Sequence, residues 1–491
     1  MFNDYMWKTY LNAGGQNIVD LFEKNFISEN LSNEYIDCIG KLRGAYCPEK
    51  EIIEETNEQL FDLSKDLSEN LGLLENGEYT IESALEFLYD GIKGEDDYSD
   101  IDIFSCFSDS IEYFTTYLAI EIPDLFIPYY FKFNFNILEK IAQEFEINLP
   151  PIPVKKDYQG RFFYYGEICA ALLNFREEHN MSPYELYAFL YDFAPKYVGG
   201  IDSYIIKNLP EPKSVFFIGG SKNDASIKNN PNTIACWQCN PDTRAGDMVV
   251  MYLRTPISAI DSIWRSVSVG FNDPFFYYYR CTYIAKPQKL KPIKLKQLQS
   301  DPIFKELPIV RKNMQGINGV ELFPSVYNHL LDITECNLPR LEYMKDDTDA
   351  TYQQEKDVEI KLIKPFLEKL GYAENEYCQQ LYIEIGNHNH ALIPDFVIHP
   401  IVTSGHQSAD FLIEAKLSIS SNKLLDAAKT QARSYAKLLN AKYSVVAAKE
   451  GIWISKVDDD YSNDIYVFSW SELKKEDNFF KIFKLIGNGN I

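Results

Sequence analysis

The feature of this sequence that most constrains its fold is a change of pattern near Lys213. Before this point, long stretches have the apolar spacing of helices. After it come short β-branched or aromatic runs separated by Gly, Asn, Asp and Pro: SVFFIGG, DMVVMYL, SIWRSVSVGF and FFYYYRCTYIA. Such runs are typical of a compact β-barrel or sandwich. Because 491 residues also exceed what one core usually holds, the sequence predicts a multidomain α+β protein.

Residues 1–200 are expected to form a mainly helical domain. Residues 136–145 (NILEKIAQEF) have helical spacing and are followed by a proline-rich stretch. Residues 164–195 predict two helices, with Ser182 as the N-cap of the second and a proline in its first turn. No catalytic pattern is recognised here, so we expect a helical scaffold or interaction module.

The net charge of −24 is concentrated in residues 1–150. They hold 9 Lys and Arg against 31 Asp and Glu, a balance of −22, whereas the other 341 residues hold 39 against 41, a balance of −2. Residues 211–330 hold 15 against 9, a balance of +6. The global charge therefore does not exclude nucleic-acid binding, because local fields decide which ligands are attracted. At the acidic region we expect a partner protein, with DNA mimicry as a further hypothesis.

In the C-terminal part, charged side chains interrupt apolar strands. Alternation along FLIEAKL (411–417) places Glu414 and Lys416 on one face, and Asp395 opens another β-branched run, PDFVI. Charges in such runs cost free energy unless something compensates them. Two carboxylates from neighbouring strands suit Mg²⁺, which prefers oxygen ligands. A lysine beside them can orient an attacking water or neutralise charge on phosphorus.

The helix expected before these strands also carries acidic side chains on its inward face. In residues 354–372, an apolar stripe recurs at helical spacing, and both Glu355 and Glu359 fall within it. A glutamate on an inward face needs a partner, and a metal ion is one candidate. The residues alone do not show which of the two glutamates faces the site.

A second helix is expected over residues 422–440. Gln431 and Tyr435 join its apolar inward face, whereas Arg433 and neighbouring lysines lie on the other side, where a phosphate backbone can meet them. The run YSVVAAKEGIWIS, which comes next, predicts two further core strands.

This combination resembles the PD-(D/E)xK nucleases, and among them the nuclease domain of type I restriction subunits. The resemblance is carried by the first helix, PD at 394–395, EAK at 414–416 and QARSY at 431–435. It implies an α/β restriction-endonuclease-like domain over 352–491, with Mg²⁺ as the cofactor and Mn²⁺ as an alternative ion. The implied roles are metal binding by Asp395 and Glu414, assistance to the water by Lys416, support of the site or DNA contact by Gln431 and Tyr435, and a helix carboxylate at Glu355.

Two other interpretations of these residues stay open. In the first, Asp395 caps a turn and Glu414 pairs with Lys416 on an exposed strand. In the second, the nuclease fold is retained only for binding.

Residues 211–331 are similar to PUA-like domains of the EVE type, through RAGDMVVMY (244–252) and PIVRKNMQGINGVELFP (308–324). The resemblance implies a β-barrel that accepts a flipped or unpaired base in an aromatic-walled pocket. The expected base-reading residues are Trp237, Tyr252, Trp264, Asn240 and Asp261, and the expected DNA-backbone contacts are Arg244, Arg254 and Arg265. Core packing is the alternative for each aromatic residue, and FFYYY (275–279) is expected to be a barrel strand.

Together these features predict a restriction-type DNA endonuclease that depends on Mg²⁺ and on a DNA modification, in an antiviral defence setting. The alternative is a non-catalytic protein that binds modified nucleic acid with the nuclease fold as a scaffold. We expect a homodimer, because cutting both strands with one nuclease domain usually needs two copies. Nine scattered cysteines and no apolar stretch of membrane-spanning length predict a cytoplasmic protein with free thiols and no membrane segment.

Overall fold

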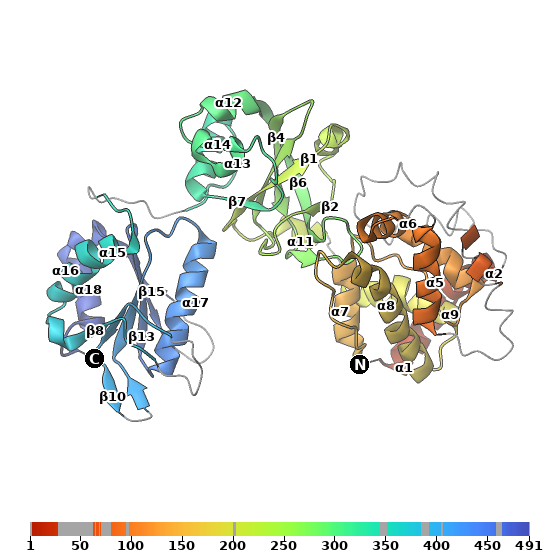
Figure 1. The fold of residues 1–491 in the computed structure, drawn as a ribbon, viewed down its shortest axis with the longest axis horizontal. Helices are drawn as coiled ribbons and strands as arrows, with labels where there is room; N and C mark the ends of the chain where they lie inside the picture. The colour runs from red at the N-terminus through yellow and green to blue at the C-terminus, as the bar shows by residue number, and fades with distance from the viewer. Residues whose placement is uncertain are drawn as a thin grey trace. The chain divides into compact units, whose positions relative to one another are not determined.

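The protein is a mixed α+β molecule with a helical N-terminal part, a curled β-sheet and a C-terminal α/β part (Figure 1). The computed structural model describes residues 2–27, 80–94, 98–199, 203–342, 351–383, 392–403, 406–457 and 464–490, together with six residues between 62 and 69. Contacts divide the chain into two compact units, Met1–Glu321 and Leu322–Ile491. The first unit contains both the helical part and the curled sheet.

The helical part packs around an aromatic-rich core that extends along the chain from Trp7 to Ala194. Its helices are α1 (Asp4–Tyr10), α2 (Gln16–Ile27), α5 (Ile81–Lys93), α6 (Asp100–Glu121), α7 (Phe135–Phe145), α8 (Tyr158–Glu178), α9 (Pro183–Ala188), α10 (Ala194–Val198) and α11 (Ser203–Lys207). The predicted helices α7, α8 and α9 are present, and Ser182 caps α9 by accepting a hydrogen bond from the N–H of Glu185. Helix α8 packs against α5 and α6. Removal of the acidic residues 1–150 would therefore divide this core and would not release an intact domain.

The curled sheet forms a half-barrel of the kind expected for a PUA-like domain. Its strands are β1 (Val215–Gly220), β2 (Ala235–Gln238), β3 (Met248–Leu253), β4 (Ala259–Ser266), β5 (Phe271–Asn272), β6 (Arg280–Lys294) and β7 (Val320–Leu322), in the order β2-β6-β4-β3-β1-β7 with β5 beside β6. Strands β1 and β3 pair in parallel. The sheet curls until β2 approaches β1, where the indole N–H of Trp237 donates to the carbonyl of Gly219 at 3.0 Å.

The helical part and the half-barrel each insert an aromatic side chain into the core of the other. Phe275, from the half-barrel, is fully buried in the helical core, where its ring centroid lies 4.8 Å from that of Tyr129. Phe133, from the helical part, is buried in a cluster of half-barrel residues that includes Phe276 and Tyr283. Each part therefore completes the core of the other.

Buried polar groups fix this exchange in place. The carboxylate of Asp273, which is fully buried, accepts hydrogen bonds from the N–H groups of Phe133 (2.6 Å), Phe275 (2.9 Å) and Phe276 (3.2 Å). The guanidinium of Arg161, also fully buried, donates to the carbonyls of Pro274 and Phe276 at 2.8 and 2.7 Å. These bonds satisfy backbone groups that would otherwise be buried without partners.

The expectation of a strand at 275–279 is wrong. Residues 273–279 form a turn between β5 and β6, and Tyr279 has a positive φ of 71°. Aromatic residues favour strands, but here Asp273 and Pro274 begin a turn, and its aromatic rings point into separate cores.

The C-terminal unit contains a six-stranded sheet with helices on both faces (Figure 1). The strand order is β15-β14-β13-β12-β9-β8, with β8 (Tyr377–Gln379), β9 (Phe396–Ile398), β12 (Phe411–Ala415), β13 (Tyr443–Ala448), β14 (Gly451–Lys456) and β15 (Asp464–Ser469). The remaining elements are α14 (Pro324–Thr334), α15 (Glu355–Val358), α16 (Lys364–Lys369), α17 (Asn422–Leu438), α18 (Glu476–Ile486) and the hairpin of β10 (Ile401–Thr403) and β11 (His406–Ser408). Helix α17 covers one face, and α16 and α18 cover the other.

The predicted alternation along β12 is confirmed. Phe411, Ile413 and Ala415 pack in the core beneath α16 and α18, whereas Leu412 packs beneath α17. The side chain of Glu414 therefore points to the α17 side of the sheet. Strand β12 pairs in parallel with β13, and α17 is the crossover between them.

We predict that Asp273 makes the stability of the protein depend on pH. Burial raises the pKa of Asp273 to about 6, although backbone N–H groups oppose this shift. The folded protein thus binds the proton of the Asp273 carboxyl group more tightly than the unfolded chain does. This proton binding stabilises the fold at low pH, and the stabilisation is lost as the pH rises through about 6. When the pH is lowered from 8 to 5, the free energy of unfolding of the wild type should rise by about 1 kcal/mol more than that of Asp273→Asn. Denaturant unfolding at several pH values measures this difference, and Asp242→Asn, at an exposed position, is the control. Parallel pH profiles of stability for the wild type and Asp273→Asn would contradict the prediction.

Candidate functional site

The first candidate site lies where β9 and β12 bring carboxylates together in the C-terminal unit. The N–H of Ala415 donates to Oδ2 of Asp395 at 2.8 Å, which fixes the Asp395 side chain beside β12. Lys416 directly follows β12, and its Nζ lies 2.7 Å from Oε1 of Glu414 on that strand. The structure therefore brings Asp395, Glu414 and Lys416 together at one place on the sheet.

Glu414 is the member of this cluster with the least favourable environment. It is only 2% exposed, and among the described residues its Oε2 atom finds no hydrogen-bond partner. Burial, against the opposing hydrogen bond from Lys416 and together with the nearby charge of Asp395, raises the pKa of Glu414 to about 7. The pair between Glu414 and Lys416 matches one alternative interpretation, but the strand is buried rather than exposed. A buried carboxylate oxygen without a partner is an unfavourable arrangement unless a cation or a proton occupies that position.

The pKa values of the neighbouring groups shift in the same environment. Burial raises the pKa of Asp395, against the opposing effects of the Ala415 N–H and the Lys416 charge. For Lys416, burial lowers the pKa, but its hydrogen bond to Glu414 and the surrounding carboxylates outweigh burial and raise it. Lys416 is therefore a protonated donor at neutral pH.

The two helix glutamates that the sequence could not separate both act on the site, but they differ in their contacts. Oε2 of Glu359, which is buried, accepts from Lys356 at 2.6 Å and from Gln379 at 3.3 Å. Besides burial, the charges of both glutamates raise the pKa of Asp395, and Glu359 contributes more than Glu355. The charge of Glu355 also raises the pKa of Glu414 and of Lys416. A π-helical turn, Glu359–Ile363, begins at the second glutamate and leads into α16, and turns of this kind often occur at functional sites.

Helix α17 carries the remaining predicted residues of this domain. Nε2 of Gln431 donates to the hydroxyl of Tyr435 at 3.1 Å, so these two side chains lie together on the inward side, and Tyr435 is buried in the core beneath α17. Arg433 lies on the same helix, half-buried.

The chemistry of this donor set fits Mg²⁺ or Mn²⁺. Among the described residues, no three His, Cys, Asp or Glu side chains are arranged to hold an ion by themselves. Mg²⁺ does not require such a cage, because it usually keeps several waters and takes one or two carboxylates together with substrate phosphate. Asp395 and Glu414 supply that pair, and the unpartnered Oε2 of Glu414 is an available ligand atom.

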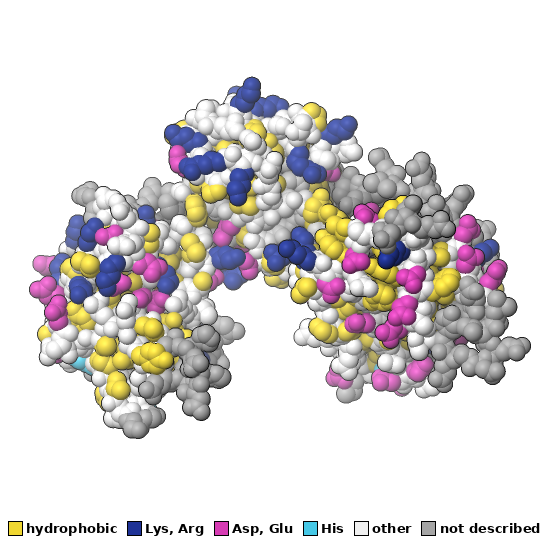
Figure 2. Space-filling model, viewed as in Figure 1, with side chains coloured by type: hydrophobic (Ala, Val, Ile, Leu, Met, Phe, Trp, Pro, Cys, Tyr) yellow, Lys and Arg dark blue, Asp and Glu magenta, His cyan; other side chains and the backbone are white. Residues whose placement is uncertain are grey.

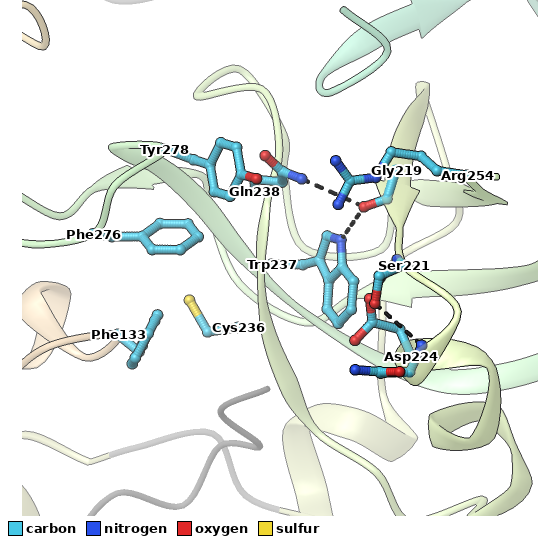
Figure 3. A pocket seen from close by; sticks show the side chains of 11 residues that line it. Phe133, Gly219, Ser221, Asp224, Cys236, Trp237, Gln238, Arg254, Phe276 and Tyr278 are labelled. Atoms are coloured by element: carbon cyan, nitrogen blue, oxygen red, sulfur yellow. Dashed lines mark hydrogen bonds between the residues drawn. The ribbon is translucent and has the colours of Figure 1, made fainter. Parts of the chain in front are cut away.

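The second candidate site is a pocket of about 180 Å³ in the first unit (Figure 3). It is lined by Phe133, Gly219, Ser221, Asn223, Asp224, Cys236, Trp237, Gln238, Arg254, Phe276 and Tyr278. Trp237 lies at its centre, with Phe133 and Phe276 on one side and Ser221 and Asp224 on the other (Figure 3).

Only some of the residues expected to read a base lie at this pocket. Trp237 lines it, and so does Arg254, which was expected at the DNA backbone. Tyr252 and Trp264 are buried and do not line it, and the indole N–H of Trp264 donates to Ser262 at 2.9 Å.

The other predicted polar residues of this domain make structural contacts. Nδ2 of Asn240 donates to the carbonyl of Gly319 at 2.9 Å, and Asp261 forms a buried ion pair with Lys228. Arg265 donates through Nε to the carbonyl of Gly246 at 2.8 Å. Arg244 is exposed. On the face drawn in Figure 2, Lys and Arg side chains are frequent over the half-barrel, whereas Asp and Glu predominate over the helical part.

Several pocket residues were missed by the sequence reasoning. Gln238 had a signal, since it is a polar residue at the end of the apolar strand β2 and directly follows Trp237. Phe276 and Tyr278 were misplaced with the expected strand. Phe133 gave no local signal, because its place in the pocket depends on contacts with residues 140 or more positions away.

In the parts of the chain that the structure describes, helices long and apolar enough to span a bilayer are absent. No protein-family model and no curated protein matches the chain. Two solved structures are similar to about a quarter of it. One is the NMR structure of Rpa0253 from Rhodopseudomonas palustris, at 12% identity and a TM-score of 0.22, covering 26% of this chain and 95% of that one. The other is a crystal structure of a mutant ZmASCH protein from Zymomonas mobilis, at 14% identity and a TM-score of 0.20, covering 26% and 99%. At these TM-scores the likenesses carry no argument about function, and neither protein is named as a nuclease.

Proposed function

We propose that this chain is a Mg²⁺-dependent deoxyribonuclease of the restriction type, with its catalytic site in a PD-(D/E)xK-like C-terminal domain. The observation that carries this proposal is the buried Oε2 of Glu414, which lies beside Asp395 and Lys416 and has no hydrogen-bond partner among the residues that the structure describes. Structural ion pairs are normally satisfied on both sides, whereas catalytic groups are often held in unfavourable environments.

Each residue of the cluster has a distinct role in phosphodiester hydrolysis. Asp395 and Glu414 would hold the divalent ion, which supplies charge neutralisation at the scissile phosphate and a more acidic water. Asp395 is oriented by the Ala415 N–H, and Glu414 by Lys416. Nζ of Lys416 has three donors and uses one on Glu414, so the others can orient the attacking water or stabilise charge on the phosphate. Burial lowers the pKa of Lys416, but the hydrogen bond and charge of Glu414, and then the charge of Glu355, outweigh burial and raise it.

The pocket in the half-barrel supports a second activity, the binding of an extrahelical base. A base outside the duplex needs an aromatic stacking surface, and Trp237, Phe276 and Tyr278 provide one. Joined to the nuclease site, such a pocket would make cleavage dependent on a base modification. If cleavage is absent, base binding alone remains as the alternative function.

We predict that Asp395→Ala, Glu414→Gln and Lys416→Ala each lower DNA cleavage by at least about 100-fold, because each removes charge stabilisation at the phosphate. Relaxation of supercoiled plasmid and digestion of phage genomes that carry different modified cytosines, both with Mg²⁺, measure this. Asp477→Ala, at an exposed position in the first turn of α18, serves as the control and should cut as the wild type does. If the wild type leaves every modified and unmodified DNA intact, the binding function is favoured over the nuclease.

A metal-binding test does not require activity. Glu414→Gln removes a buried charge, so the metal-free variant should be at least as stable as the wild type. Mg²⁺ or Mn²⁺ at ten times its Kd should stabilise the wild type by about 1.4 kcal/mol and leave Glu414→Gln unaffected. Thermal unfolding with either ion or with EDTA measures both effects. Equal stabilisation of the two proteins would exclude Glu414 as a metal ligand.

A further inference from the structure

The pocket in the first unit contains a buried acceptor without a donor. Gln238 is 7% exposed, and its Oε1 atom finds no hydrogen-bond partner among the described residues. Its Nε2 atom donates only weakly, at 3.4 Å, to the carbonyl of Gly219, which also accepts from Trp237 at 3.0 Å. A carboxamide oxygen buried in this way costs about 1–3 kcal/mol unless a ligand donates to it. The site is therefore suited to a ligand that carries an N–H group.

The size and charge of the pocket narrow the ligand class. About 180 Å³ is less than the roughly 300–1,000 Å³ of pockets that hold drug-sized ligands, so a single base fits better than a whole nucleotide. Asp224 lines the pocket and is 7% exposed, and its carboxylate disfavours a phosphate group inside. Arg254 is exposed at the pocket and can contact a phosphate that remains outside. This arrangement suits a neutral base whose sugar-phosphate chain lies in solvent.

One wall of the pocket comes from the helical part of the chain. Phe133 lines the pocket, and its ring centroid lies 5.2 Å from that of Phe276. Its φ of 69° places it in the left-handed region, which is strained for a bulky aromatic residue and costs about 1–3 kcal/mol. Two buried groups of the half-barrel hold it there, since its N–H donates to Asp273 and its carbonyl accepts from the Tyr283 hydroxyl, each at 2.6 Å. Such strain is typical of residues that must be held in one position at a binding site.

We propose that the helical part completes the base pocket, with Phe133 as a wall that determines which base fits and with Gln238 Oε1 as the acceptor of an N–H on the base edge. This inference rests on the proposed base binding and extends it to the contribution of the helical part. Trp237, Phe276 and Phe133 provide the stacking and enclosing surfaces, and Gln238 supplies the polar contact that orients the base.

The test measures binding of short single-stranded DNA oligonucleotides that differ at one central position, which carries cytosine, methylated cytosine, thymine, adenine, guanine or an abasic site. Fluorescence anisotropy in EDTA gives affinities of the full chain without cleavage. The wild type should bind at least one base-containing oligonucleotide about 10-fold more tightly than the abasic one, because stacking of one base contributes about 1–3 kcal/mol.

Gln238→Leu removes the carboxamide at nearly constant size. It should lower the affinity for the preferred base by about 10- to 100-fold and leave binding of the abasic oligonucleotide unchanged. Its melting temperature should not fall, because in the described part of the chain the lost oxygen has no partner and the lost Nε2 donates only at 3.4 Å. A fall in melting temperature with unchanged affinity would make Gln238 a structural residue and overturn its assigned role.

Phe133→Leu shortens the wall and keeps the position apolar. It should change the ratio of purine to pyrimidine affinity by about 10-fold, since a site discriminates by size to about this extent. Phe480→Leu, at an exposed position on α18, is the matched control and should keep the wild-type ratio. If Phe133→Leu folds as judged by its melting temperature and keeps the wild-type ranking of bases, Phe133 is not the wall that selects the base.

The outcomes separate this inference from the proposed function. A preference for bases over the abasic site that survives both substitutions supports base binding and overturns the roles of Phe133 and Gln238. Equal binding of all oligonucleotides by the wild type overturns both. Cleavage in the presence of Mg²⁺ is a separate measurement and bears on neither result.

Discussion

The buried carboxylate of Asp273 joins two parts of the chain that the sequence presents as separate domains. It accepts N–H groups from its own turn and from Phe133, which lies 140 residues earlier. Hydrogen bonds to an ionised acceptor are stronger than neutral ones, and here they hold strained backbone in place. The exchange of Phe133 and Phe275 between the two cores, and the shape of the pocket beside Phe133, both depend on this group.

The two candidate sites share one physical signature. At each, a deeply buried oxygen is left without a donor in the described structure, Oε2 of Glu414 in the C-terminal unit and Oε1 of Gln238 in the first unit. Neighbouring polar residues that the sequence reasoning also selected, such as Asn240 and Asp261, have partners within the protein. Core side chains such as Tyr129 and Tyr187 also have a buried hydroxyl without a described partner, so it is the combination of such an oxygen with a pocket or a charged cluster that marks the two sites.

The sequence correctly predicted those features of the fold that depend on neighbouring residues in the chain. The alternation along β12, the helices α7 and α17 and the cap at Ser182 follow from residue spacing and capping chemistry, and all are present. The turn at 273–279 was missed because aromatic residues have high strand propensity in any context. The different contacts of Glu355 and Glu359, such as the hydrogen bond from Gln379 to Glu359, are tertiary and do not follow from spacing, since residues four apart share a helix face. The position of Phe133 depends on long-range hydrogen bonds that no sequence window contains.

The π-helical turn Glu359–Ile363 sets a constraint on the length of the chain in this region. A regular helix advances about 100° per residue, so the extra residue in a wide turn changes the angular offset between the helical segments on its two sides. On the C-terminal side of the turn, Phe366 and Leu367 are anchored in the core, while on the N-terminal side the charge of Glu355 acts on the acidic cluster. Deleting or inserting one residue between them would rotate Glu355 around the helix axis and leave the apolar anchor in place. The position of Glu355 relative to the apolar anchor therefore depends on the number of residues in this segment.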